Sequence, residues 1–144
     1  MEDKTNILLS EMYRNVKTGS AGIVSVLPKV DDRFMIRELA RDLERCESYT
    51  RSVGDMIHSR GGELRELPAS ARLRLRAGIA FNSAVDSSDR NLAGIYITGA
   101  KSSVQRLERA RREAEVCCDA NVLRLCSDII ESERMSISKM EEFL

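Results

Sequence analysis

Residues 91–100 (NLAGIYITGA) carry no charged side chain, although 32% of the residues in the chain are Asp, Glu, Lys or Arg. The apolar residues of this segment do not form one helical stripe, because Leu92, Ile95 and Ile97 point to different sides of a helix. A helix on a protein surface normally presents a polar face to water. We therefore expect the segment to be covered on every side, either within its own bundle or by a second chain.

The length and charge of the chain limit the class of protein. Its 144 residues predict a single domain, 1–144, that buries about two-thirds of the surface exposed by the unfolded chain. The 23 basic and 23 acidic residues cancel, so net charge does not attract the protein to nucleic acid or to an anionic membrane. The N-terminal segment lacks the apolar core of a signal peptide, and no uncharged run approaches the roughly 20 residues of a membrane span. We therefore expect a cytoplasmic protein without a nucleic-acid or membrane partner.

The spacing of apolar residues predicts an all-α chain with four long helices. We expect them at residues 5–27, 32–60, 88–115 and 120–143. The short turns inside each pair make the helices of that pair antiparallel neighbours. The first and last pairs would therefore form two helical hairpins.

Polar and glycine residues mark the ends of these helices. Asp31 or Asp32 can cap the second helix, Gly61-Gly62 can end it, and Asp119 can cap the last one. The long connection 61–88 predicts an extended arm and then a short helix with Ser70 as its cap, before a new cap within residues 86–88.

Two of the expected helices have a regular inner face. In helix 32–60 that face comprises Ile36, Leu39, Leu43, Cys46, Thr50, Val53 and Ile57. In helix 120–143 it comprises Val122, Cys126, Ile129, Glu133, Ile137, Met140 and Leu144. Glu133 is therefore a carboxylate at a core position.

A core carboxylate raises the question of a metal site. Di-iron helical bundles use one Glu from each of two helices and a Glu-x-x-His motif from each of the other two. The candidate metal ligands here are Glu11, Glu44, Glu47 and Glu133, which could bind iron or manganese. No His stands three positions after any of these residues, and we favour solvated or locally paired carboxylates over a metal site. We expect no cofactor.

The remaining reactive residues do not form a recognisable catalytic set. His58 is the only histidine, and Cys46, Cys117, Cys118 and Cys126 lack the Cys-x-x-Cys spacing of a zinc site. Cys117-Cys118 is interpreted as a turn with reduced thiols rather than a redox pair. We therefore expect no catalytic residue and no enzymatic activity.

Three arginines in the connection form a possible basic edge. Arg72, Arg74 and Arg76 alternate with leucines and could bind phosphate. The nearby acids Glu63 and Glu66 offer local ion-pair partners instead. Steeply salt-dependent binding to DNA or RNA would favour the phosphate hypothesis.

The layout resembles the ferritin-like superfamily, in which two helical hairpins are joined by a long crossover that contains a short helix. The motif that supports the resemblance is a Thr-Gly pair inside an uncharged segment, found at Thr18-Gly19 and again at Thr98-Gly99. The chain looks most like small bacterial ferritin-like proteins with a glycine in the first and third helices. In such relatives a Glu often follows the glycine, whereas Ser20 and Ala100 follow it here. The resemblance thus implies a ferritin-like four-helix bundle that has lost its di-iron ligands and acts as a scaffold or binding module.

The partner prediction returns to the uncharged segment. We expect some of its apolar side chains to face outward, so that the surface from Leu92 to Ala100 forms a two-fold homodimer, with Gly94 and Gly99 allowing close approach of backbones. The alternative cover is the apolar part of the crossover, residues 73–85, lying across the same helix within one chain. The variant Tyr96→Glu would separate the two, because only a dimer interface would change the oligomeric state.

Overall fold

The computed structural model describes residues 3–64, 69–116 and 119–144. These residues form only helices and connecting turns, which confirms the all-α prediction. The five α-helices and one 3-10 turn are α1 (Lys4–Val26), η1 (Leu27–Lys29), α2 (Arg33–Ser59), α3 (Ala69–Val85), α4 (Asp89–Ala114) and α5 (Ala120–Glu141). The expected boundaries of the four long helices are correct to within two residues.

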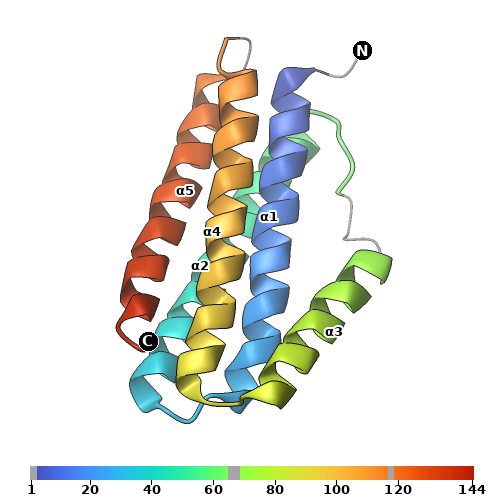
Figure 1. The fold of residues 1–144 in the computed structure, drawn as a ribbon. Coiled ribbons are helices and arrows are strands. Elements are labelled where there is room, and N and C mark those ends of the chain that lie inside the picture. Colours follow the sequence, from blue (N-terminus) through green and yellow to red (C-terminus); the bar gives the residue numbers. More distant parts are fainter. Residues whose placement is uncertain (1–2, 65–68, 117–118) are drawn as a thin grey trace.

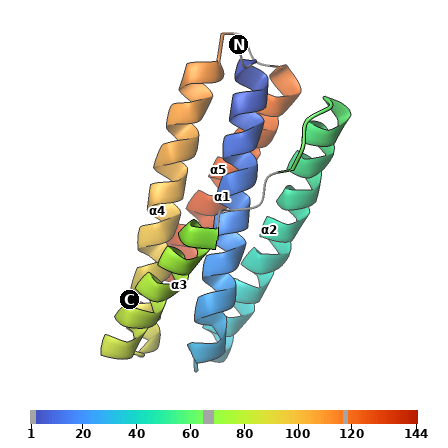
Figure 2. The same cartoon turned by 90° about the vertical axis from the view of Figure 1, so that its right-hand side faces the viewer.

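The four long helices form two antiparallel pairs that pack side by side (Figure 1). Helix α1 pairs with α2, α4 pairs with α5, and the two pairs meet mainly where α1 packs against α4. Helix α3 leaves this group and lies on its outside, against α1 and α4 (Figure 2). The crossover contains the expected helix, but at 17 residues α3 is longer than the short helix that the sequence predicts.

Side chains cap the helices at most of the predicted places. Oδ1 of Asp32 accepts hydrogen bonds from the backbone N–H groups of Phe34 (2.8 Å) and Met35 (3.0 Å). The side chains of Ser88 and Asp119 cap α4 and α5 in the same way. Gly61 follows α2 with a φ of 75°, a left-handed conformation that glycine adopts at low cost. The prediction for Ser70 is wrong, because this residue lies within the first turn of α3.

Hydrogen bonds also join the two helical pairs at both ends. The carboxylate of Asp89, in the first turn of α4, accepts from the backbone N–H groups of Asp31 (2.9 Å) and Asp32 (2.8 Å) in the turn before α2. At the other end, the N–H of Asp119 donates to the hydroxyl of Thr5 (3.2 Å). These contacts fix the register between the pairs.

The predicted inner faces are largely buried, with a correction at the start of α2. Leu39, Val53 and Ile57 are buried as expected, but Ile36 is 38% exposed and Met35 is buried in its place. Neighbouring residues on an α-helix point in directions that differ by about 100°. Where two adjacent residues are both apolar, the sequence alone does not decide which of them faces the core. In α5, every predicted inner residue except Glu133 and the exposed Leu144 is buried.

The large apolar side chains of the uncharged segment are buried or partly buried within a single chain. Leu92 and Ile97 are buried, while Ile95 and Tyr96 are partly buried against the core. Helix α3 packs against α4, and its Leu75 and Ile79 line the same cavity as Ile95 and Tyr96, as the alternative cover within one chain would place them. The homodimer remains a prediction.

Three glycines inside the helices have no close neighbour within the chain. A Cβ atom added to Gly22, Gly94 or Gly99 would meet no heavy atom of another residue within 4 Å. Within one chain no neighbour packs closely at these three positions, and the approach of two copies at Gly94 and Gly99 stays a prediction. Within the described residues, none of the helices is long and apolar enough to cross a membrane.

Candidate binding cavity between the helices

A cavity of about 330 Å³ lies at the centre of the helix group and receives side chains from all five α-helices. Its walls are mainly apolar, with Ile23, Ile95 and Ile129 among them. Gly22, Gly78 and Gly99, from three helices, are among the lining residues, and a Cβ atom added at any of them would meet nothing within 4 Å. The volume lies at the small end of the roughly 300 to 1,000 Å³ that small-molecule sites occupy.

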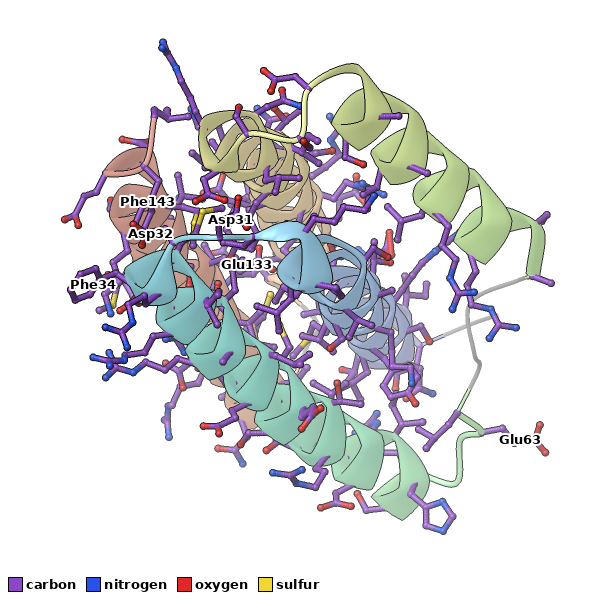
Figure 3. All side chains as sticks on the ribbon, turned by 90° about the horizontal axis from the view of Figure 1, so that it is seen from below. Asp31, Asp32, Phe34, Glu63, Glu133 and Phe143 are labelled. Atoms are coloured by element: carbon purple, nitrogen blue, oxygen red, sulfur yellow. The ribbon has the colours of Figure 1, made fainter. Side chains whose placement is uncertain are left out.

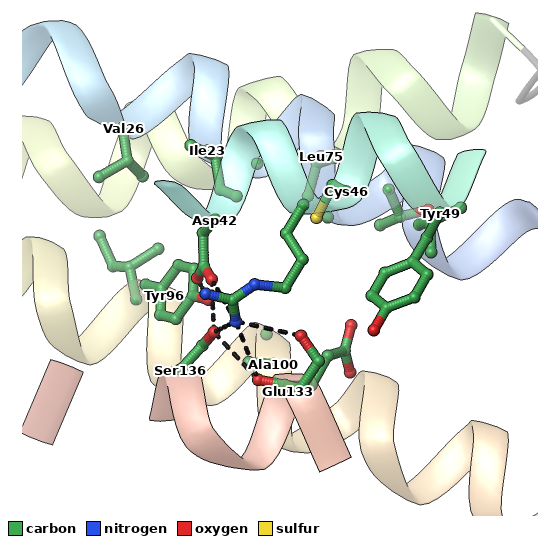
Figure 4. A pocket seen from close by; sticks show the side chains of 18 of the residues that line it. Ile23, Val26, Asp42, Cys46, Tyr49, Leu75, Tyr96, Ala100, Glu133 and Ser136 are labelled. Atoms are coloured by element: carbon green, nitrogen blue, oxygen red, sulfur yellow. Dashed lines mark hydrogen bonds and ion pairs between the residues drawn. The ribbon is translucent and has the colours of Figure 1, made fainter. Parts of the chain in front are cut away.

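Asp42 of α2 is the centre of a polar cluster at one end of this cavity (Figure 4). The hydroxyl of Tyr96 donates to Oδ2 of Asp42, and the hydroxyl of Ser136 donates to Oδ1. Nη1 of Arg45 lies 3.3 Å from the same Oδ1 and also donates to the hydroxyl of Ser136 at 3.0 Å. Asp42 therefore has both a cation and hydroxyl donors, as a buried carboxylate requires.

Glu133 lines the same cavity but lacks comparable partners. Figure 3, seen from below the helix group, shows Glu133 between the helices, whereas Phe34 and Glu63 point outward. Its Oε1 lies 3.3 Å from the hydroxyl of Ser103, and Oε2 is buried without a hydrogen-bond partner among the described residues. Burial raises the pKa of Glu133 from 4.5 to about 7, the Ser103 hydroxyl lowers it in part, and the negative charge of Asp42 raises it further.

The contact from Ser103 is weaker than its distance suggests. A hydroxyl has one proton to donate, and Ser103 is closer to Oδ1 of Asn15 (2.6 Å) than to Glu133. The amide group of Asn15 is oriented by its Nδ2, which donates to the carbonyl oxygen of Glu11 (2.9 Å), so Oδ1 is the atom left to accept. The Ser103 proton therefore goes to Asn15, and an ionised Glu133 has no good donor.

Two further ionisable side chains of the cavity, Cys46 and Tyr96, stay neutral near pH 7. Burial raises the pKa of the Cys46 thiol from 9.0 to about 12, and the nearby charges of Asp42 and Glu133 add to the rise. Burial and the adjacent Asp42 also raise the pKa of the Tyr96 phenol well above its usual range. A protonated thiol and phenol are poor nucleophiles, so neither group is activated for covalent chemistry.

The four carboxylates proposed as metal ligands are not brought together. Glu133 lines the cavity, Glu11 is half-buried in α1, and Glu44 and Glu47 are exposed on α2. Within residues 3–64, 69–116 and 119–144, no group of three or more His, Cys, Asp or Glu side chains is arranged to hold a metal ion. The vicinal Cys117 and Cys118 lie outside the described residues.

The basic residues of α3 line a separate groove on the outer side of the molecule. Arg72 and Arg76 are exposed there beside Lys17 of α1 and Arg51 of α2, with Glu47 as the acidic neighbour. The side chain of Arg74 lies outside what the structure describes. Two of the three arginines therefore share one groove with cations from other helices.

The sequence pattern indicates Glu133, but it does not indicate Asp42, Tyr96 and Ser136 as a site. The signal was available in part, because Asp42 sits directly before Leu43 on the inner side of a helix and three residues before Arg45. What the sequence did not show is that Tyr96 and Ser136, which come from α4 and α5, meet this carboxylate.

Comparison with known proteins gives no match, whether to a protein-family model, a curated protein or a solved structure.

Proposed function

We propose that this protein is a ferritin-like helical binding module that holds a small, largely apolar molecule in its central cavity and catalyses no reaction on it. The observation that carries the proposal is the cavity itself, whose lining includes glycines from three helices. Glycine inside a helix costs about 0.5 to 1 kcal/mol relative to alanine. A cavity lined by glycines that lower the stability of their helices favours a role in binding over a purely structural role.

The arrangement of the helices supports the ferritin-like part of the proposal. Two antiparallel pairs joined by a crossover helix are the layout that the resemblance implies. Ser20 and Ala100 follow the glycines of the two Thr-Gly pairs, where an acid would be needed for a di-iron site. The binding role would then replace metal chemistry in the same cavity, in a cytoplasmic protein.

The polar cluster supports binding rather than catalysis. Asp42 is occupied by Arg45, Tyr96 and Ser136, so it has no free position from which to accept a proton from a substrate. The Cys46 thiol, with a pKa of about 12, is not an activated nucleophile. The cluster is suited to orienting a ligand and to fixing the packing of α2, α4 and α5.

The proposal can be tested by filling the cavity. Gly22→Leu adds a side chain to a cavity wall, and Gly94→Leu is the matched control because Gly94 is also in a helix with open space but does not line the cavity. Methyl NMR spectra recorded with millimolar 1-hexanol should show shifts for Ile23, Ile95 and Ile129 in the wild type and in Gly94→Leu. Gly22→Leu should abolish them. An unshifted wild-type spectrum would refute the binding role.

A residual metal site is the competing proposal, and the buried Glu133 is the observation that favours it. Protein purified natively from cells supplied with iron and manganese should contain little bound metal if the cavity serves an organic ligand. About two transition-metal ions per chain, as in di-iron bundles, would support the metal site instead.

A further inference from the structure

The two carboxylates of the cavity differ in charge compensation. Asp42 forms an ion pair with Arg45 and accepts from two hydroxyls, so this pair is neutral as a whole. Glu133 has no ion pair within the described part of the chain, and its Oε2 has no hydrogen-bond partner there. An ionised Glu133 would therefore leave one uncompensated negative charge in a largely apolar cavity, which is costly.

The free protein can avoid this cost by keeping Glu133 protonated. The carboxyl would then donate its proton to the Ser103 hydroxyl, whose own proton goes to Oδ1 of Asn15. Such a series of hydrogen bonds satisfies Ser103 and Asn15 and leaves Glu133 without a charge beside the cavity. A ligand that brings a positive charge would instead stabilise the ionised carboxylate.

We propose that the ligand of the cavity has a short apolar body and a protonated amine, and that its ammonium group forms a charge-assisted hydrogen bond with the carboxylate of Glu133. The inference rests on the proposed function, since it names the chemical class of molecule that the cavity takes. Ile23, Ile95 and Ile129 would contact the apolar body, and the glycine walls would accommodate its width. Charge-assisted hydrogen bonds of this kind are about twice as strong as neutral ones.

The charged groups around Glu133 are compatible with a cation. Those that line the cavity around it on α2 are Asp42, Arg45, the neutral Cys46 and Tyr49, whose hydroxyl lies 3.4 Å from the carbonyl oxygen of Asp128 (Figure 4). Helices α4 and α1 contribute the uncharged Ser103 and Asn15. Because Arg45 is paired with Asp42, its positive charge is largely cancelled at the position of the ligand. The unbalanced charge of the cavity is therefore that of Glu133.

Binding of an ammonium group should be linked to the release of a proton. The amine remains protonated, Glu133 loses its proton to solvent, and the ion pair forms between the two. With a pKa of about 7, the ionised fraction of Glu133 rises about tenfold between pH 6 and pH 8. The affinity for an amine should rise by the same factor over that range.

Calorimetric titration with three probes of equal length tests this proposal. Hexylammonium should bind about tenfold more tightly at pH 8 than at pH 6, whereas 1-hexanol should bind with little pH dependence and hexanoate more weakly than either. Glu133→Gln should weaken hexylammonium binding at pH 8 and remove its pH dependence while leaving 1-hexanol binding in place. Glu131→Gln, on the exposed side of the same helix, is the matched control and should behave as the wild type.

Two other results would have different meanings. Binding of all three probes with equal affinity and no pH dependence would overturn the amine inference but leave the proposed binding function intact. Absence of binding for all three at millimolar concentration would overturn both.

Discussion

Replacing Glu133 with Gln should make the protein more stable at pH 8 and leave its stability almost unchanged at pH 4. The pKa of Glu133 is raised from 4.5 to about 7 in the folded protein, mainly by burial. A carboxyl with a raised folded-state pKa contributes stability that is fully present below its unfolded pKa. That contribution is lost as the pH rises through the folded value.

The size of the effect follows from the same two pKa values. At 1.36 kcal/mol per pH unit, the rise from 4.5 to about 7 corresponds to about 3 kcal/mol of unfolding free energy. The wild type should lose this amount relative to Glu133→Gln as the pH increases from about 4.5 to above 7, because only the wild type must bury a charge. Glutamine keeps the shape of the side chain, so packing should change little.

Urea unfolding followed by helical circular dichroism, at several pH values from 4 to 8, measures the difference directly. Other acids titrate equally in both proteins and cancel when the two are compared. Glu131→Gln controls for loss of a charge on the exposed face of the same helix and should follow the wild type at every pH. Parallel pH profiles for wild type and Glu133→Gln would refute the claim that this carboxyl is buried without compensation.

Further substitutions test the fold and the remaining site chemistry. Gly22→Ala should raise the unfolding free energy by about 0.5 to 1 kcal/mol in urea denaturation, since alanine suits a helix better and meets no neighbour; a loss of stability would mean that this space is not open. Leu39→Ala should cost about 2 to 5 kcal/mol, whereas Ile36→Ala should cost far less because that residue is 38% exposed; equal losses would contradict the observed orientation of α2. Asp32→Ala should cost about 1 kcal/mol through loss of the N-cap of α2, and an unchanged denaturation midpoint would argue against the cap. Cys46 should resist iodoacetamide in the folded protein at pH 8, because a thiol with a pKa of about 12 is almost entirely protonated; rapid labelling, measured by mass spectrometry, would contradict its burial.

The helices could be predicted well because local residues determine their ends. Asp32 and Asp119 stand before regular apolar stripes, and Gly61 follows one, so cap chemistry and periodicity agreed there. The crossover was harder to predict, since residues 69–85 combine apolar and basic residues without a clear stripe. Its length as a helix depends on packing against α1 and α4 rather than on a local signal.

The candidate site could be predicted only in part. Glu133 was recognisable because it occupies a position on the inner face of α5 that otherwise carries apolar residues. Asp42 was not recognised because an acid beside Arg45 on a helix is usually a solvated ion pair. Only the approach of Tyr96 and Ser136 from other helices makes it a buried site, and sequence spacing within one helix does not contain that information.

The glycines show why open space is difficult to infer from sequence. A glycine inside a helix is compatible either with a close helix contact or with a cavity wall, and the sequence is the same in both cases. A Cβ atom added to Gly19 would lie 3.6 Å from the Cys46 sulfur, an ordinary contact, whereas Gly22, only one turn further, faces empty space. The distinction depends on the distance between helices, which long-range packing determines.

The most direct test of the central claim is the pKa of the Glu133 carboxyl measured by carbon-detected NMR, with and without hexylammonium. A cavity that contains an uncompensated carboxylate and binds a cationic ligand predicts a value of about 7 in the free protein. It also predicts a clear decrease when hexylammonium is bound, because the ammonium group stabilises the ionised form. A value near 4.5 in the free protein that does not change with the amine would contradict the account.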